Sequence, residues 1–205
     1  MESSPEPCTL FSSAPVQYLT VWRKSLLFNG HGYTVYDDAD GSIVFRVEDY
    51  AHDWRRHALL MDRHGNVLLT VRRCRCNQIL NLWESWKAYK GDEDAQMITK
   101  GERRRPLFKA TKDLGSSSCT ISMFTEQGSP RSSSLGYQMS WSRTKEWFTI
   151  YQVAPINTLV AEASRKYGSS TPKKLLDKDV LALRVFPGMD RALAMAMIMI
   201  TNSMR

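Results

Sequence analysis

The chain alternates between short apolar runs and clusters of turn residues over most of its length. In the run 42–48, Ile43, Phe45 and Val47 occupy every second position, which is the period of a strand that is buried on one face. Between such runs lie stretches such as NGHG and RHGN, whose Asn and Gly residues favour hairpin turns. The pattern therefore predicts antiparallel strands joined by tight turns.

We predict twelve strands from this pattern, and their short, regular spacing is typical of a sandwich or a barrel. The predicted strands lie at 17–28, 33–37, 42–48, 57–62, 67–73, 79–91, 106–112, 117–126, 137–142, 147–153, 158–166 and 180–186. The fold class is therefore mainly β.

One segment near the end of the chain departs from the strand pattern. The run ALAMAMIMI, at 192–200, predicts a helix. At about 1.5 Å per residue it spans roughly 14 Å, too short for a hydrocarbon core of roughly 30 Å. A helix that is apolar in every direction is normally buried on all sides. We expect its buried core side chains to be Leu193, Met195, Met197, Ile198 and Ile200.

A barrel that closes around this helix explains both patterns. About eight strands already enclose an interior that side chains can fill, so about twelve strands leave a hollow for the helix. The sequence thus predicts a closed antiparallel barrel of about twelve strands around a buried C-terminal α-helix. A chain of 205 residues is long enough for one barrel domain, which we expect over 18–205. We also expect a flexible tail over 1–17 and a mobile Ser-rich insertion at 125–136. The protein is expected to be a monomer.

Several motifs in the early part of the chain occur together in a known family. They are SLLFNG (25–30), YTVYD (33–37), VFRVEDY (44–50), an LMD…GN turn and a Trp-containing strand near 83–86. With these motifs the chain resembles the plant LURP-one-related proteins over residues 18–205. The resemblance implies a tubby-like fold, related to tubby proteins and phospholipid scramblases, in which twelve strands surround a C-terminal helix. It also implies a role in plant defence and, by analogy with tubby, the role of a membrane-tethered transcription factor. No catalytic residue follows from it.

The net charge of +7 is unevenly distributed. Residues 1–66 hold 9 acidic against 6 basic residues, whereas the remainder holds 22 basic against 12 acidic ones. A basic surface favours anionic partners such as a lipid surface, nucleic acid or an acidic protein. A soluble protein with a high isoelectric point and no such partner is the alternative.

Two basic stretches are the candidate binding site. VRRCRC places Arg73 and Arg75 on one face of a strand and Arg72 on the other. Arginine binds phosphate bidentately and lysine adds point charge, so we expect an anionic phospholipid or phosphoinositide headgroup as the ligand. The predicted ligand-binding residues are Arg72, Arg73, Arg75, Lys100, Arg103, Arg104, Arg105, Lys109 and Lys112.

The same basic residues leave other interpretations open. They also fit a solvated charged loop, a weak nuclear-import signal at RRR, or a soluble scaffold or transcription-associated protein that binds protein partners or DNA. No reading-helix motif or aromatic stacking platform is present in the sequence, so we expect no sequence-specific recognition of nucleic acid.

We find no catalytic constellation in the sequence and expect a non-enzymatic protein without cofactor or metal. DDADG (37–41) resembles the start of an EF-hand loop, but its twelfth position is Glu48, inside a predicted strand. A β-turn is therefore expected there. Cys74 and Cys76 do not complete a zinc site.

The four histidines, at 31, 52, 57 and 64, fall mostly in or near predicted turns and are interpreted as surface residues.

The N-terminal residues and the cysteines concern location in the cell. The first residues lack the basic and apolar regions of a signal peptide. We therefore expect a cytoplasmic protein with reduced thiols, either peripheral to the plasma membrane or also nuclear.

Overall fold

The computed structural model describes residues 15–23, 31–49, 57–74, 84–92, 105–124, 136–142, 144, 147–167 and 179–203. Within these ranges the chain forms twelve strands and the helix α2 (Arg191–Ser203). The strands are β1 (Gln17–Trp22), β2 (His31–Asp37), β3 (Ile43–Asp49), β4 (His57–Asp62), β5 (Val67–Cys74), β6 (Ser85–Lys90), β7 (Phe108–Lys112), β8 (Ser118–Met123), β9 (Gly136–Ser142), β10 (Trp147–Gln152), β11 (Thr158–Arg165) and β12 (Val180–Val185).

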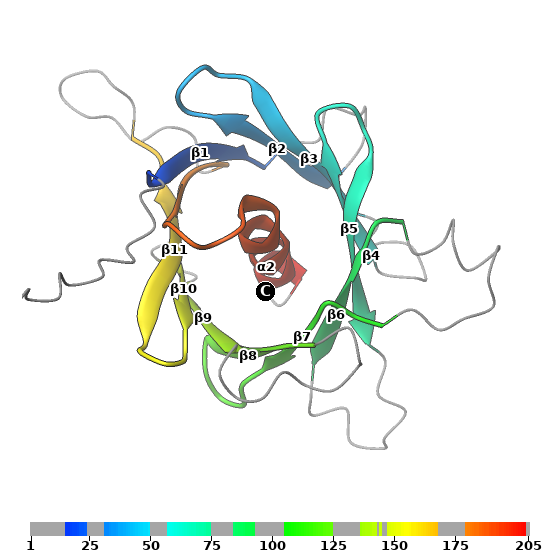
Figure 1. Cartoon of the computed structure of the whole chain (residues 1–205), viewed down its shortest axis with the longest axis vertical. Helices are drawn as coiled ribbons and strands as arrows, with labels where there is room; N and C mark the ends of the chain where they lie inside the picture. The colour runs from blue at the N-terminus through cyan, green and yellow to red at the C-terminus, as the bar shows by residue number, and fades with distance from the viewer. Residues whose placement is uncertain are drawn as a thin grey trace, which may run out of the picture.

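The strands form one closed antiparallel barrel (Figure 1). Each strand pairs with its neighbours in sequence, and β1 closes the sheet by pairing with both β2 and β12. Leu19, for example, lies opposite Asp37 on one side and Leu183 on the other. All twelve predicted strands are present, and the predicted mainly β barrel around a C-terminal helix is confirmed.

Strand alternation sends apolar side chains inward and hydroxyl or charged side chains outward. In β8, for example, Cys119 and Ile121 are buried, whereas Thr120 and Ser122 face outward and are exposed. Several inward positions are alanines, among them Ala88 and Ala110. Small inward side chains leave room along the barrel axis for a helix.

Helix α2 fills this room and lies along the barrel axis against β4 and β5 (Figure 1). Met195, Met197, Ile198 and Ile200 are buried, as predicted. The prediction was wrong for Leu193, which is only partly buried, because the first turn of α2 lies at the open end of the barrel.

Local interactions fix where α2 begins. Asp190 precedes the helix, and its Oδ1 accepts a hydrogen bond from the Leu193 N–H at 2.7 Å, which is the geometry of an N-cap. Arg191 places a positive charge at the helix N-terminus, where the helix dipole disfavours it. Its Nη1 lies 3.5 Å from Oδ2 of Asp37, at the end of β2, which offsets that cost.

The barrel has two distinct ends. We call the end at which α2 begins the mouth end; the β2–β3 and β4–β5 turns also lie there. The opposite end, which holds the last residues of β5 and β7, is the far end. β-Bulges interrupt the β2–β3, β4–β5 and β10–β11 pairs close to the mouth end, which is a usual place for bulges in barrels.

Parts of the predicted organisation lie outside the described residues. The predicted tail 1–17 is described only from Pro15, and Gln17 already belongs to β1. Of the predicted insertion 125–136, only Gly136 is described, as the first residue of β9. Within the described ranges, no helix is both long and apolar enough to cross a membrane.

Substitution of Met197 tests whether the barrel depends on its central helix. Met197→Ala leaves a cavity in a fully buried site, and we expect the free energy of unfolding to fall by about 2–5 kcal/mol. Met197→Lys buries a charge without a partner and is expected to abolish the cooperative transition. Urea unfolding followed by tryptophan fluorescence measures both; a wild-type midpoint for Met197→Lys would contradict the buried position.

A glycine pair tests the close strand approach between β2 and β3. A Cβ at Gly32 would lie 2.0 Å from the carbonyl oxygen of Val47, whereas a Cβ at Gly136 would lie 3.5 Å from that of Ile121. Since backbone must move to relieve the first contact, we expect Gly32→Ala to destabilise the protein by roughly 1–3 kcal/mol. Gly136→Ala is the matched strand control, and equal unfolding midpoints for the two variants would refute the steric explanation.

Candidate functional site

The two arginines at the end of β5 point to opposite faces of the barrel wall. Arg73 lies opposite Trp86, which is buried in the interior, whereas Arg72 lies opposite Lys87. The sequence prediction that these two arginines occupy different faces is therefore confirmed. It follows that the predicted ligand-binding residues do not form a single cluster.

Three cations form a row across the outer face of neighbouring strands. Lys87 of β6 lies directly opposite Arg72 of β5 on one side and Lys109 of β7 on the other. Neighbouring strands are about 4.8 Å apart, so the outermost two backbones are about 10 Å apart. We call Arg72, Lys87 and Lys109 the basic row.

The residues directly opposite the two ends of this row are a histidine and a serine. Arg72 lies opposite His57 of β4, and Lys109 lies opposite Ser122 of β8. Like charges that face each other across strands destabilise a sheet. Among the described residues, Lys87 and Lys109 form no ion pair. An anion bound over the row would relieve this repulsion.

The other two predicted cations of these strands belong to the rim of the far end. Arg73 Nη2 lies 2.5 Å from Glu84 Oε1, and Lys112 Nζ lies 3.7 Å from Oε2 of the same carboxylate. The Arg73 guanidinium also lies over the Trp86 ring, 5.7 Å from its centroid. Glu84 thus partly neutralises both cations, and we assign them a structural role at the rim of the far end.

The remaining predicted site residues are only partly described. Arg105 lies just before β7, outside the basic row, and has interactions of its own. Arg75, Lys100, Arg103 and Arg104 lie outside the described residues, so their part in the site stays a prediction.

Sequence reasoning missed Lys87, although it is the centre of the basic row. The run SWKAYK places Lys87 between the apolar Trp86 and Ala88, so strand alternation indicates that the Lys87 side chain points outward. Its position opposite both Arg72 and Lys109 depends on the pairing of three strands, which single runs do not reveal.

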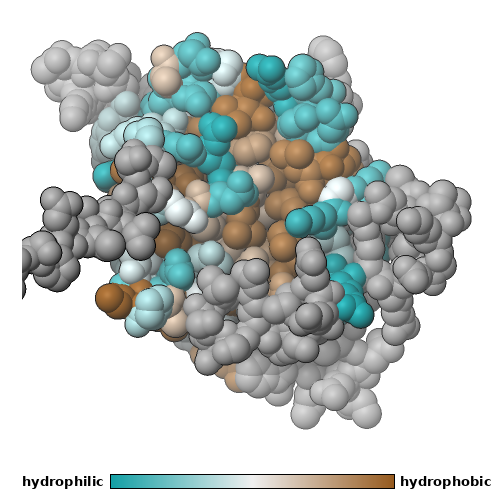
Figure 2. All heavy atoms as spheres, viewed as in Figure 1, coloured by the Kyte–Doolittle hydropathy of each residue, from teal (hydrophilic) through white to brown (hydrophobic). Residues whose placement is uncertain are grey.

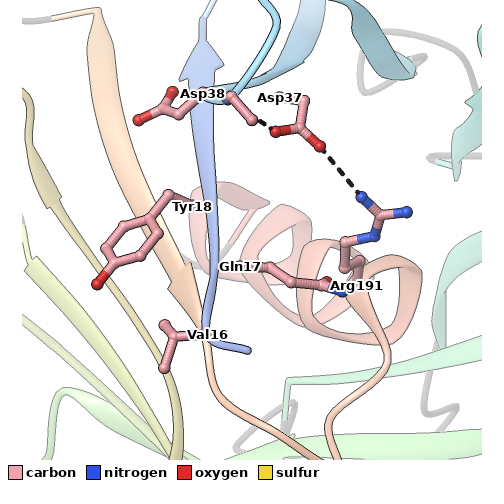
Figure 3. A pocket seen from close by; sticks show the side chains of 7 residues that line it. Val16, Gln17, Tyr18, Asp37, Asp38 and Arg191 are labelled. Carbon is pink, nitrogen blue, oxygen red and sulfur yellow. Dashed lines mark hydrogen bonds and ion pairs between the residues drawn. The ribbon is translucent and has the colours of Figure 1, made fainter. Parts of the chain in front are cut away.

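A pocket of about 400 Å³ lies at the mouth end, between the start of β1, the β2–β3 turn and the start of α2. Figure 3 shows Asp37 and Arg191 turned toward each other, whereas Tyr18 and Asp38 point to the other side of β1. On that side Lys166 Nζ lies 2.8 Å from Asp38 Oδ1. Since its charged groups are paired in this way, we assign the pocket the structural role of fixing α2.

Two polar motifs have structural explanations. The DDADG stretch is the turn expected from the sequence: the Gly41 N–H donates to the Asp37 carbonyl, and the Ser42 N–H donates to Asp40 Oδ1. Among the described residues, no three His, Cys, Asp or Glu side chains are grouped so that they could hold a metal ion.

Two reactive side chains lie in buried positions. His57 is a buried residue of β4, so its interpretation as a surface histidine was wrong; it is the first residue of the strand and pairs with Arg72 of β5. Burial in the barrel, helped by the charge of Asp113, raises the pKa of the Cys119 thiol to about 12. The thiol therefore stays protonated at neutral pH, and Cys119 is not a nucleophile there.

Comparison with known proteins gives the chain a family. A family model described as LURP-one-related matches residues 17–202. Two Arabidopsis thaliana relatives, protein LURP-one-related 5 and protein LURP-one-related 17, are 36% and 33% identical to it, over 90% and 91% of this chain and 81% and 82% of their own lengths.

A solved structure is similar at the level of the fold. The X-ray structure of an Arabidopsis thaliana protein matches 92% of this chain and 91% of its own length, with a TM-score of 0.59 and 16% sequence identity. This likeness concerns the fold alone. The family model and the relatives show that the chain belongs to the LURP-one-related family.

Proposed function

We propose that the chain is a non-enzymatic module that binds anionic phospholipid headgroups, phosphoinositides included, at a membrane surface through its basic row. The observation that carries the proposal is the direct opposition of Arg72, Lys87 and Lys109 on three neighbouring strands. Such an arrangement lowers the stability of the free protein and is compensated when a polyanion binds.

The chemistry of the row suits phosphate groups. Arginine offers a planar fork of donors for a phosphate, and lysine offers a compact charge. The Ser122 hydroxyl next to Lys109 adds a neutral donor of the kind that also binds phosphate oxygens. Each cation near an anionic leaflet contributes about 1 kcal/mol, so three of them support reversible recruitment.

The cellular setting is also part of the proposal. The resemblance to plant LURP-one-related proteins suggests defence signalling, with the barrel peripheral to the plasma membrane and in the cytoplasm or nucleus. The second candidate is a soluble scaffold or transcription-associated protein, whose basic surface would bind protein partners or DNA. The net charge of +7 favours an anionic partner in either case.

Flotation with phosphatidylcholine vesicles tests the lipid-binding function. One set carries a phosphoinositide and another carries phosphatidylserine at equal total negative charge. We expect the wild-type chain to float with anionic vesicles at low salt and to dissociate as salt increases. Lys87→Glu combined with Lys109→Glu is expected to weaken binding by at least about tenfold, because two attractive contacts become repulsive.

The matched control changes the net charge equally at a different place. Arg63→Glu combined with Lys90→Glu reverses two exposed cations at the mouth end and should change binding less than about twofold. Equal losses for both double variants would show a response to net charge alone. Absence of wild-type binding to phosphoinositide vesicles at low salt would end the proposal, and preferential binding to a DNA duplex would favour the second candidate.

A further inference from the structure

The β7–β8 turn presents an apolar side chain to solvent on the same side of the barrel as the basic row. Leu114 of this turn is 59% exposed, and β7 carries Lys109, which lies opposite Lys87 in the row. In Figure 2 apolar residues gather in the centre of the view, where Figure 1 places α2, with hydrophilic residues around them. Leu114 is thus an apolar side chain outside this enclosed interior.

Among the described residues, the other exposed large apolar side chains lie on a different part of the ring of strands. They belong to β1, to the β10–β11 turn and to the end of β11: Tyr18, Trp22, Val153, Ile156 and Tyr167. The basic row lies on β5–β7, and in the closed ring β6 is directly across from β12. Of these described side chains, Leu114 is therefore the one that can contact a surface bound by the basic row.

Local hydrogen bonds hold the β7–β8 turn in one shape. The Asp113 carboxylate accepts hydrogen bonds from the Ser118 and Thr120 hydroxyls of β8 at 2.5 Å and 3.0 Å, and the Asp113 N–H donates to the Ser118 carbonyl. Gly115 has a φ of +70°, a conformation that favours glycine. Leu114 lies between Asp113 and Gly115, so its backbone is already ordered and loses little conformational freedom when the side chain binds.

The charges beside the turn do not oppose contact with an anionic surface. Asp113 is the only carboxylate of the turn, and Lys112 directly precedes it. At the same rim Glu84 lies between Arg73 and Lys112. These two carboxylates and two cations cancel, so the three cations of the basic row determine the sign of this part of the wall.

We propose that Leu114 inserts into the apolar region of an anionic leaflet while the basic row contacts the headgroups of the same leaflet. This inference rests on the proposed function, because the row brings the turn to the membrane. Stable attachment of a peripheral protein takes two signals, such as an apolar group together with a basic patch. Each cation strengthens binding about fivefold, and burial of the leucine side chain adds roughly tenfold.

Flotation of a Leu114→Ser variant with the anionic phosphatidylcholine vesicles measures the contribution of the side chain. We expect its partition onto the vesicles to fall roughly tenfold, by the same factor with phosphatidylserine and with a phosphoinositide, because insertion does not depend on the headgroup. The factor is expected to stay constant as salt increases, since salt screens charges and not apolar contacts. Leu114→Phe is expected to restore binding.

Two other variants separate insertion from surface charge and from general apolarity. Ile156→Ser is the matched control, because it removes a side chain that is 75% exposed in the β10–β11 turn, far from the basic row. It is expected to leave the partition unchanged. Lys87→Glu combined with Lys109→Glu is expected to lose most of its binding at low salt, where charge contributes most.

Tryptophan fluorescence tests insertion directly. Leu114→Trp places an indole in the β7–β8 turn, and Ile156→Trp places one in the control turn. The anionic vesicles carry bromine atoms on their acyl chains, which quench an indole that touches them. Relative to the wild-type chain, we expect additional quenching on vesicle binding for Leu114→Trp and none for Ile156→Trp.

The outcomes distinguish this inference from the proposed function. Wild-type binding by Leu114→Ser, an equal loss for Ile156→Ser, or no additional quenching in Leu114→Trp would overturn insertion and leave the basic row in place. A loss in Leu114→Ser with none in Lys87→Glu combined with Lys109→Glu would overturn the basic row instead, and absence of wild-type binding would end both proposals. Thermal unfolding checks that each variant is folded, and Leu114→Ala replaces Leu114→Ser if the latter is not.

Discussion

The enclosure of an apolar helix by a closed sheet is the interaction on which the rest of this molecule depends. Twelve strands enclose more space than their own side chains can fill, and inward alanines such as Ala88 and Ala110 widen it further. Without α2 the barrel would be hollow, and without the barrel the methionines and isoleucines of α2 would face water. Each element is therefore stable only in the presence of the other, because neither can bury its apolar surface alone.

This mutual burial determines where charged residues are placed. An interior filled with apolar side chains accepts charge only at its ends, and Arg73 and Lys112 accordingly share Glu84 at the far rim. Lys90, opposite the inward-facing Leu69, lies at the other end, whereas Arg72, Lys87 and Lys109 face outward. The basic row is thus a consequence of alternation in three paired strands. Barrel stability does not explain why Lys87 and Lys109 form no ion pair with the described residues. Natural proteins keep such unfavourable arrangements where function requires them.

The sequence by itself determined the architecture, because the period of each run and the all-round apolarity of 192–200 are local properties of consecutive residues. It also separated Arg72 from Arg73, since alternation is local. Only the tertiary structure decided that Lys87 joins Arg72 and Lys109, that Arg73 and Lys112 share Glu84, and that Leu193 lies at an open mouth. These facts depend on register, bulges and barrel closure, which bring together residues that are distant in sequence, and no single run contains that information.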